Sequence, residues 1–203
     1  MNKSHLSLLA PLGILAAFSG TADAASLSFA PSAQRGLEVG GRVTADLVVS
    51  DLGETGAPSL GGFSVEILFD EAVLGFNSAS FGGSLGAIVS DDPFDFTADA
   101  YGEVTPGTGD VALLETSYLL PAELDALQSD SFVLATLAFD VASLGSTTLS
   151  FGAVELTNAF GNVIADPKLN NGFVPIPATA SLMVPGLGLM GWLRRRRKAR
   201  ASA

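Results

Sequence analysis

The chain has 203 residues, which is enough for one ordinary domain once its two ends are set aside. It has no cysteine, so disulfides, thiolate metal sites and a cysteine nucleophile are excluded, and its single histidine is His5. Residues 25–173 carry 20 acidic and 3 basic side chains, a formal charge of −17. Such a segment repels nucleic acid, which excludes that class of partner.

The first 24 residues have the pattern of a secretory signal peptide. Lys3 precedes an apolar core over 6–18, and Ala22 and Ala24 are the small residues expected before a cleavage site. The apolar core is too short to act as a stable membrane anchor. We therefore predict that signal peptidase removes residues 1–24 and that the rest of the chain is exported.

Between the two ends, short runs of alternating apolar and polar residues, separated by glycine and proline, predict β-strands. One helix is predicted at 121–128, because Pro121 suits a first helical position and Leu124 and Leu127 share a face. Glycine-rich or acidic stretches at 90–99 and 102–109 are predicted to be loops. The predicted strands are 26–30, 42–50, 62–70, 73–81, a short edge strand at 88–89, 111–118, 132–141, 147–151 and 154–157.

This pattern predicts an all-β fold, a jelly-roll or Greek-key β-sandwich of about nine strands over residues 25–173. In the longest strand the inward positions are predicted to be Val133, Ala135, Leu137, Phe139 and Val141. The predicted core as a whole comprises Val43, Leu47, Val49, Phe63, Val65, Ile67, Phe69, Leu137 and Phe139.

Residues 174–203 combine a proline motif, an apolar run and a basic end. The run, residues 178–193, would be about 24 Å long as a helix, slightly shorter than a bilayer core. A basic cluster after it stays cytoplasmic by the positive-inside rule and stops transfer. The body is then exported, in agreement with the signal peptide. The proline motif is Val174, Pro175, Ile176, Pro177 and Ala178, and the membrane stop is Arg194, Arg195, Arg196, Arg197 and Lys198.

This tail resembles the PEP-CTERM type of bacterial sorting signal, and more closely its VPLPA-CTERM variant, with Ile176 in place of leucine. The resemblance implies recognition by a membrane-embedded exosortase that cleaves near the proline motif. It also implies an exported protein of a Gram-negative bacterium, held transiently at the inner membrane and then released to the cell surface or extracellular matrix. The alternative is an uncleaved single-pass anchor.

The body has a resemblance of its own. Residues 60–76, LGGFSVEILFDEAVLGF, are similar to the cohesin pattern of an alternating strand ending in aromatic-Asp, followed by a Val-Leu-x-Phe strand. Residues 132–139 are similar to a later cohesin strand. The resemblance implies the nine-stranded jelly roll that cohesins share with related carbohydrate-binding modules. It also implies a surface that holds a dockerin-like partner, without assigning contact residues.

An acidic and aromatic loop is the densest candidate site. Asp91, Asp92, Asp95 and Asp99 could hold calcium through carboxylate oxygens, although their spacing matches no defined calcium loop; the alternative is a solvated acidic loop. Phe94 and Phe96 beside them could anchor a partner, but we expect them to plug the end of the sandwich.

These observations favour a secreted, non-enzymatic binding or scaffold protein of the cell envelope or extracellular matrix. No catalytic, cofactor or metal residue is assigned. The alternative is a carbohydrate-binding module acting on extracellular polysaccharide, although the single tryptophan, Trp192, lies in the tail. A glycoside hydrolase is the third reading, because 20 acids in the body make some close carboxylate pairs unavoidable.

Overall fold

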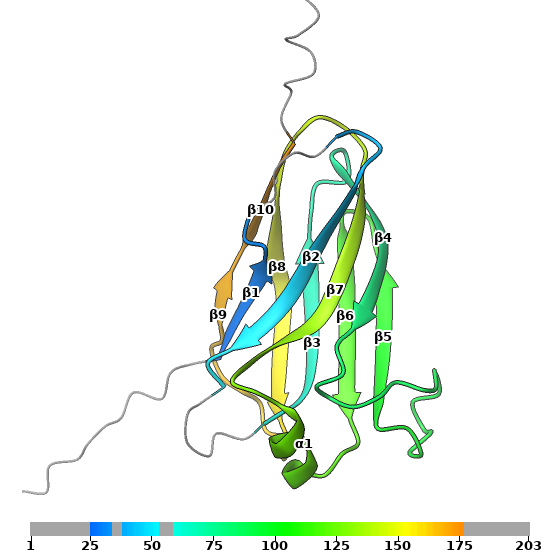
Figure 1. Ribbon diagram of the computed structural model, residues 1–203, viewed down its shortest axis with the longest axis vertical. Helices are drawn as coiled ribbons and strands as arrows, with labels where there is room; N and C mark the ends of the chain where they lie inside the picture. Colours follow the sequence, from blue (N-terminus) through cyan, green and yellow to red (C-terminus); the bar gives the residue numbers. More distant parts are fainter. Residues whose placement is uncertain (1–24, 34–37, 53–58, 177–203) are drawn as a thin grey trace, which may run out of the picture.

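A computed structural model describes residues 25–33, 38–52 and 59–176 (Figure 1). Two five-stranded sheets pack face to face as a β-sandwich, and one short helix closes an end. Within these residues no helix has the length and apolar character needed to cross a membrane. The predicted signal peptide and the predicted membrane segment, residues 178–193, lie outside the described residues.

The first sheet has the strand order β4-β7-β2-β1-β9. Neighbouring strands are antiparallel, except that β9 runs parallel to β1. The strands are β1 Ser26–Ala30, β2 Arg42–Ser50, β4 Leu74–Phe81, β7 Ser131–Val141 and β9 Lys168–Asn170. β1 and β2 have the bounds that alternation predicts.

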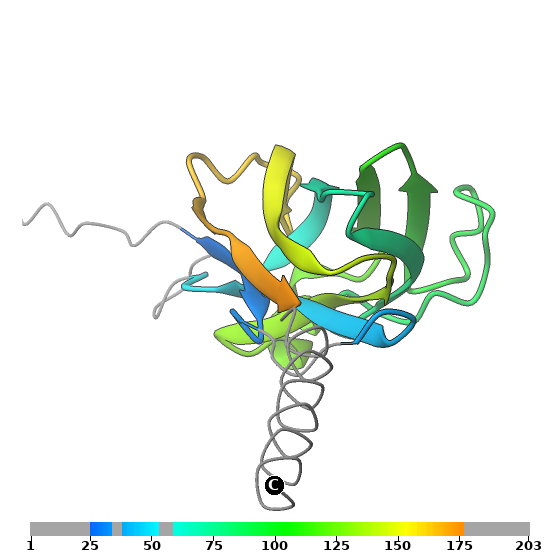
Figure 2. The ribbon, with the colours of Figure 1, turned by 90° about the horizontal axis from the view of Figure 1, so that it is seen from above.

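The second sheet has the order β10-β8-β3-β6-β5 and is antiparallel throughout. From β2 onward the chain crosses between the sheets at nearly every connection, and Figure 2 shows the resulting two layers. The predicted helix is confirmed as α1, Pro121–Leu127, between β6 and β7. The strands are β3 Leu60–Leu68, β5 Ala100–Pro106, β6 Asp110–Ser117, β8 Gly145–Asn158 and β10 Gly172–Ile176.

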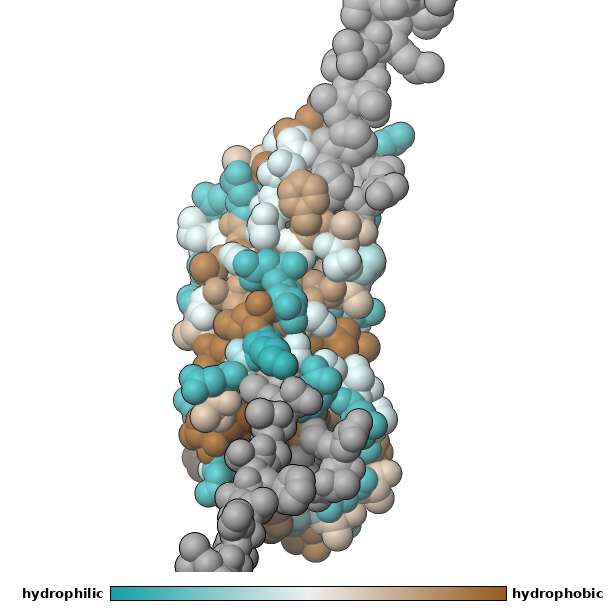
Figure 3. All heavy atoms as spheres, turned by 90° about the vertical axis from the view of Figure 1, so that its left-hand side faces the viewer, coloured by the Kyte–Doolittle hydropathy of each residue, from teal (hydrophilic) through white to brown (hydrophobic). Residues whose placement is uncertain are grey.

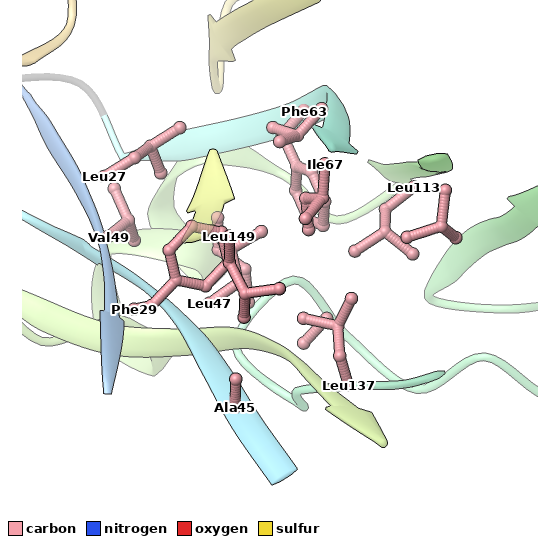
Figure 4. Packing of buried hydrophobic residues seen from close by; sticks show 14 of the residues in the cluster. Leu27, Phe29, Ala45, Leu47, Val49, Phe63, Ile67, Leu113, Leu137 and Leu149 are labelled. Atoms are coloured by element: carbon pink, nitrogen blue, oxygen red, sulfur yellow. The ribbon is translucent and has the colours of Figure 1, made fainter. Parts of the chain in front are cut away.

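The core lies between the sheets and receives side chains from both, as Figure 4 shows. Eight of the nine predicted core residues are buried. The ninth, Phe69, is half-buried and packs against the core, with its ring centroid 5.1 Å from that of Phe139. The alternation of β2, β3 and the second half of β7 therefore located the core correctly.

A β-bulge in β7 changes the inward face of its first half. Leu47 pairs with Ala135 but the next residue, Val48, pairs with Val133, so Leu134 is the extra residue. Leu134 and Ala135 are both buried, and Phe132 packs on the core in place of Val133. The prediction that Val133 points inward was wrong, because a bulge shifts strict alternation by one residue.

The segment between β4 and β6 also differs from the prediction. Residues 88–89 form no strand, and the stretch from Ala100 to Pro106, predicted in part as a loop, is the edge strand β5. Gly102 belongs in this strand because a Cβ there would collide with the side chains of Phe81 and Ile88, which pack over it. Pro106 is tolerated at the end of an edge strand, where a missing N–H costs no ladder hydrogen bond.

Four further differences concern the strands of the second half of the chain and the buried face of the helix. The two strands predicted on either side of Gly152 are one long strand, β8. Leu127 does not share the buried face of Leu124; it is exposed. The short strand β9 was not predicted, and β10 extends three residues past Phe173, where the sequence placed the end of the domain.

Candidate recognition surface

The outer face of the second sheet carries carboxylates around apolar side chains. The inward residues of β3 are Phe63, Val65 and Ile67, so the alternate residues point to solvent. The same alternation on β5, β6 and β8 presents further outward residues. We call this surface the acidic face and define it as Glu66, Leu68, Tyr101, Glu103, Leu114 and Glu155.

Leu114 lies on β6, between the strands β3 and β5. It pairs with Ser64 of β3 on one side and with Glu103 of β5 on the other. Both Leu114 and Leu68 are exposed. An exposed apolar centre with a polar and charged surround is the arrangement found in protein-binding surfaces.

The charge of the acidic face has one sign. Among the described residues the basic side chains are Arg42 on β2 and Lys168 on β9, both in the first sheet. Arg42 lies 3.5 Å from the carboxylate of Asp140 on that sheet's outer surface. The acidic face has no such internal counter-charge, so its field attracts cationic groups.

Local packing holds the carboxylates in place. The Glu66 side chain crosses to β8, where its Oε2 accepts a hydrogen bond from the Ala153 N–H at 3.1 Å. Gly152 leaves the room for this, because a Cβ there would collide with the Glu66 carboxylate. On β5 the Tyr101 hydroxyl donates to Glu103 at 3.1 Å, and this hydrogen bond raises the pKa of Tyr101.

Beside β5 the loop between β4 and β5 projects away from the sandwich in both ribbon views (Figures 1 and 2). We call its outer part, residues 90–99, the aromatic loop. Phe94 is 78% exposed and Phe96 is 71% exposed, so they do not plug the sandwich as the sequence predicted. The alternative interpretation, that they are anchors for a partner, is the one consistent with this exposure.

The aromatic loop is held to the end of β6. The hydroxyl of Tyr118 donates to the Pro93 carbonyl at 2.7 Å, and the rings of Phe96 and Tyr118 meet edge to face at 5.2 Å. The Tyr118 N–H donates to the Asp99 carbonyl at 2.8 Å. The loop therefore presents its phenylalanines from a fixed position, adjoining the acidic face.

Asp92 and Asp95 of the loop accept hydrogen bonds from other residues of the same loop. Asp92 accepts the Phe94 N–H at 2.9 Å, and Asp95 accepts the Thr97 N–H at 3.0 Å and its hydroxyl at 2.5 Å. The hydrogen bonds from Thr97 lower the pKa of Asp95. Within the described part of the chain, no group of three or more acidic or histidine side chains is arranged to hold a metal ion. Of the two interpretations of this loop, these hydrogen bonds favour the solvated acidic loop over the calcium site.

Glu115 is a residue that sequence reasoning missed. It lies on the inward face of β6 with Val111 and Leu113, is fully buried, and neither carboxylate oxygen has a hydrogen-bond partner. Burial raises its pKa to about 8. Period-2 alternation along the predicted strand 111–118 could have found it, because it places residue 115 on the same face as residues 111 and 113.

A surface hollow of about 360 Å³ lies near this region, lined by Phe81, Gly82, Gly83, Gly86, Ala87 and Ile88. Phe81 and Ile88 also cover Gly102, which pairs with Glu115. The lining contains no acidic, basic or hydroxyl side chain. The hollow therefore offers no group that could transfer a proton or act as a nucleophile.

The predicted sorting residues are only partly described. Val174 is 2% exposed and belongs to the core, and Pro175 and Ile176 follow it in β10. The remaining predicted sorting and signal residues lie outside the described residues: Pro177, Ala178, the basic cluster 194–198, Ala22 and Ala24.

Comparison with known proteins bears on the fold. Neither the protein-family models nor the curated proteins gave a match to the sequence. Solved structures do match. A non-cellulosomal cohesin from the archaeon Archaeoglobus fulgidus aligns at 12% identity with a TM-score of 0.54, over 79% of this chain and 96% of that one.

Two bacterial structures match in the same way. A type I cohesin–dockerin complex from Clostridium thermocellum aligns at 16% identity and a TM-score of 0.54, over 76% of this chain and 100% of that chain. A cohesin module from a family 33 glycoside hydrolase of Clostridium perfringens aligns at 12% identity with a TM-score of 0.52, over 75% of this chain and 94% of that chain. The fold is a cohesin-like β-sandwich, as the sequence predicted.

Proposed function

We propose that the body is a non-enzymatic recognition module that binds a protein partner through the acidic face. The observation that carries this proposal is a sheet surface with an apolar centre, carboxylates of one sign and no basic side chain on its strands. The partner that fits has an apolar centre and a basic rim, because opposite charges at the rim increase the association rate and favour one orientation. The cohesin fold supports it, since similar structures were solved as complexes with dockerins.

The aromatic loop extends this surface. Two exposed phenylalanines on a loop held by Tyr118 lose little conformational freedom when a partner covers them. The carboxylates of the same loop continue the negative charge of the acidic face. We therefore include Phe94 and Phe96 in the proposed binding surface.

Crosslinking of the secreted protein to its partner tests the proposal with two matched variants. Leu114→Arg introduces a cation at the centre of the acidic face, and Ser80→Arg introduces the same group on the outer surface of the other sheet, where Ser80 is exposed on β4. We expect Leu114→Arg to abolish the crosslinked complex and Ser80→Arg to retain it. Equal crosslinking by the two variants would contradict the assignment of the acidic face.

Binding should also weaken with salt. Raising the ionic strength from about 0.05 M to about 0.5 M shortens the Debye length several-fold and screens the rim charges. Surface plasmon resonance of the same pair at the two salt concentrations should show mainly a slower association rate.

Carbohydrate binding is the second candidate, favoured by the exposed rings of the aromatic loop beside carboxylates. Aromatic faces stack on sugar rings, and carboxylates accept hydrogen bonds from hydroxyls. Retention on immobilised extracellular polysaccharide, lost in the double variant Phe94→Ala and Phe96→Ala, would support it. Passage of the unaltered protein through such a column without delay would dismiss it.

We further propose that the protein is exported and sorted by an exosortase-type protease of a Gram-negative bacterium. The signal-peptide pattern, the proline motif and the apolar run with its basic end support this. Deleting the exosortase-type protease should leave the chain cell-associated, with Arg200 present. Secretion that is unchanged by the deletion would contradict this proposal.

A further inference from the structure

The predicted proline motif overlaps the folded body. β10 pairs with β8 along its whole length, from Gly172 opposite Leu149 to Ile176 opposite Gly145. The first three residues of the motif, Val174, Pro175 and Ile176, are therefore strand residues of the sandwich. A motif that a protease reads would be expected to lie in an accessible segment.

The N-terminal half of β10 is held on two sides. One side pairs with β8, and on the other the Phe173 N–H donates to the Ser32 carbonyl at 2.9 Å, next to a parallel bridge between Ala33 and Phe173. The Val174 side chain is buried in the core cluster. Together these contacts leave this part of the strand no free edge to offer to a protease.

Proteolysis inside a paired strand requires the strand to open first, and the rate then depends on the population of the open form. β10 keeps its pairing with β8 up to Ile176, the last residue that the structure describes, and in the sequence only Pro177 separates Ile176 from the apolar run that starts at Ala178.

We infer that the tail is removed by hydrolysis of a peptide bond on the C-terminal side of Ile176, so that all of β10 stays in the mature protein. Water adds across this bond, leaving a carboxylate on the body and an amine on the released tail. The inference rests on the proposed sorting of this protein. It adds that the folded sandwich sets the N-terminal limit of the cut.

Intact-mass and C-terminal peptide measurements on the secreted protein test the inference. The expected C-terminal residue is Ile176 or a later residue that precedes the basic cluster. A C-terminus at Pro175 or earlier would overturn the inference while leaving the sorting proposal standing. A secreted chain that ends at Ala203 would overturn both.

A matched pair of glycine variants tests whether strand pairing provides the protection. Gly172→Val lies outside the motif, and its new side chain would press on Phe29, at 2.9 Å from the Phe29 Cβ. Gly75→Val makes the same change on the edge strand β4, where the nearest atom is the Asp140 carbonyl oxygen at 3.9 Å.

Each full-length protein is treated briefly with an unspecific protease, and the C-terminal fragments are mapped by mass. We expect trimming of the unaltered protein and of Gly75→Val to stop at or after Ile176. Trimming of Gly172→Val should continue to Gly172 or beyond. Identical trimming of Gly172→Val and the unaltered protein would overturn the inference.

Discussion

Glu115 is a buried carboxyl whose neighbours offer it no hydrogen bond. It pairs with Phe63 on β3 and with Gly102 on β5, and the side chains of Phe81 and Ile88 cover Gly102. An ionised carboxylate without partners is costly in such a place, so the group retains its proton in the folded state. Burial is the cause of its raised pKa of about 8.

This carboxyl predicts a pH dependence of stability. Between the unfolded value of 4.5 and about 8 the unfolded chain releases the Glu115 proton while the folded chain keeps it, so the free energy of unfolding falls as pH rises. The size of this pKa shift sets an upper limit of about 5 kcal/mol on the unfolding free energy lost over this pH range. Urea unfolding at about pH 5 and about pH 8 should show the decline in the unaltered protein. Glu115→Gln should largely remove it.

Two features make this comparison clean. The only histidine of the chain is His5, so the body has no imidazole that titrates in this range. Glu155→Gln removes an exposed carboxylate from β8 and controls for the change in net charge. A pH slope that is the same in Glu115→Gln and in the unaltered protein would show that Glu115 is not the titrating group.

Gln128 stabilises the fold through the hydrogen bonds of its side chain. Its side chain accepts the Leu60 N–H at 2.8 Å and donates to the Leu60 carbonyl at 2.7 Å and the Ser84 carbonyl at 3.1 Å. Leu60 is fully buried, so water cannot replace these bonds. Gln128→Ala should lower the free energy of unfolding by about 2 kcal/mol, measured by urea denaturation. Ser129→Ala at the exposed neighbour should change it little.

At the scale of elements, β8 and β10 decide where the domain ends. β8 continues through Gly152, and its first five residues are the partner of β10. In this way the long strand extends the sandwich to Ile176. The side of the molecule where β9, β10 and β1 lie shows hydrophobic and hydrophilic residues intermixed (Figure 3).

β10 should contribute measurably to stability. A chain that starts at Ala25 and ends at Phe173 loses the buried side chain of Val174 and three residues of pairing with β8. Compared with a chain ending at Ile176, it should lose at least about 2 kcal/mol of unfolding free energy, the usual worth of a buried valine. Equal denaturation midpoints for the two chains would contradict the contribution of β10.

At the scale of the molecule, negative charge dominates. The 20 acids of residues 25–173 repel one another more strongly in the compact state than in the expanded chain. The melting temperature should therefore rise when sodium chloride is increased from about 0.01 M to about 0.3 M, because salt screens this repulsion. Differential scanning calorimetry measures this rise.

Calcium should stabilise the body no more than magnesium does at the same ionic strength. The aspartates of the aromatic loop accept hydrogen bonds within the loop, and the described residues contain no carboxylate cluster suited to a metal ion. A heat of calcium binding in titration calorimetry that magnesium does not reproduce would contradict this expectation.

Much of the fold could be predicted from alternation alone. β1 and β2 have their predicted bounds, and the predicted core residues are buried or pack on the core. The errors fall where a contact between distant segments outweighs local preference. Glycine is typical of loops, yet β5 needs Gly102 because the side chains of Phe81 and Ile88 occupy the space that a Cβ would take.

The recognition surface was less predictable. The acidic and aromatic loop was identified from its composition, but the position in which it is held depends on contacts of Tyr118 with Pro93 and Phe96, which lie 22 and more residues away along the chain. The acidic face required the strand order β8-β3-β6-β5, because Glu66, Glu103 and Glu155 become neighbours only through pairing. Pairing partners are set by packing between segments, which a single strand's pattern does not encode.

By itself the sequence determined the all-β class, the inward face of β2 and β3, and the segregation of acids into the body and bases into the tail, because alternation and charge are local properties. The tertiary structure decided that Glu115 is buried without a partner and that Phe94 is exposed. It also decided that Val174 belongs to the core rather than to a separate tail. The reason is common to all three: burial is a property of what packs against a residue, and those neighbours come from strands far away in the chain.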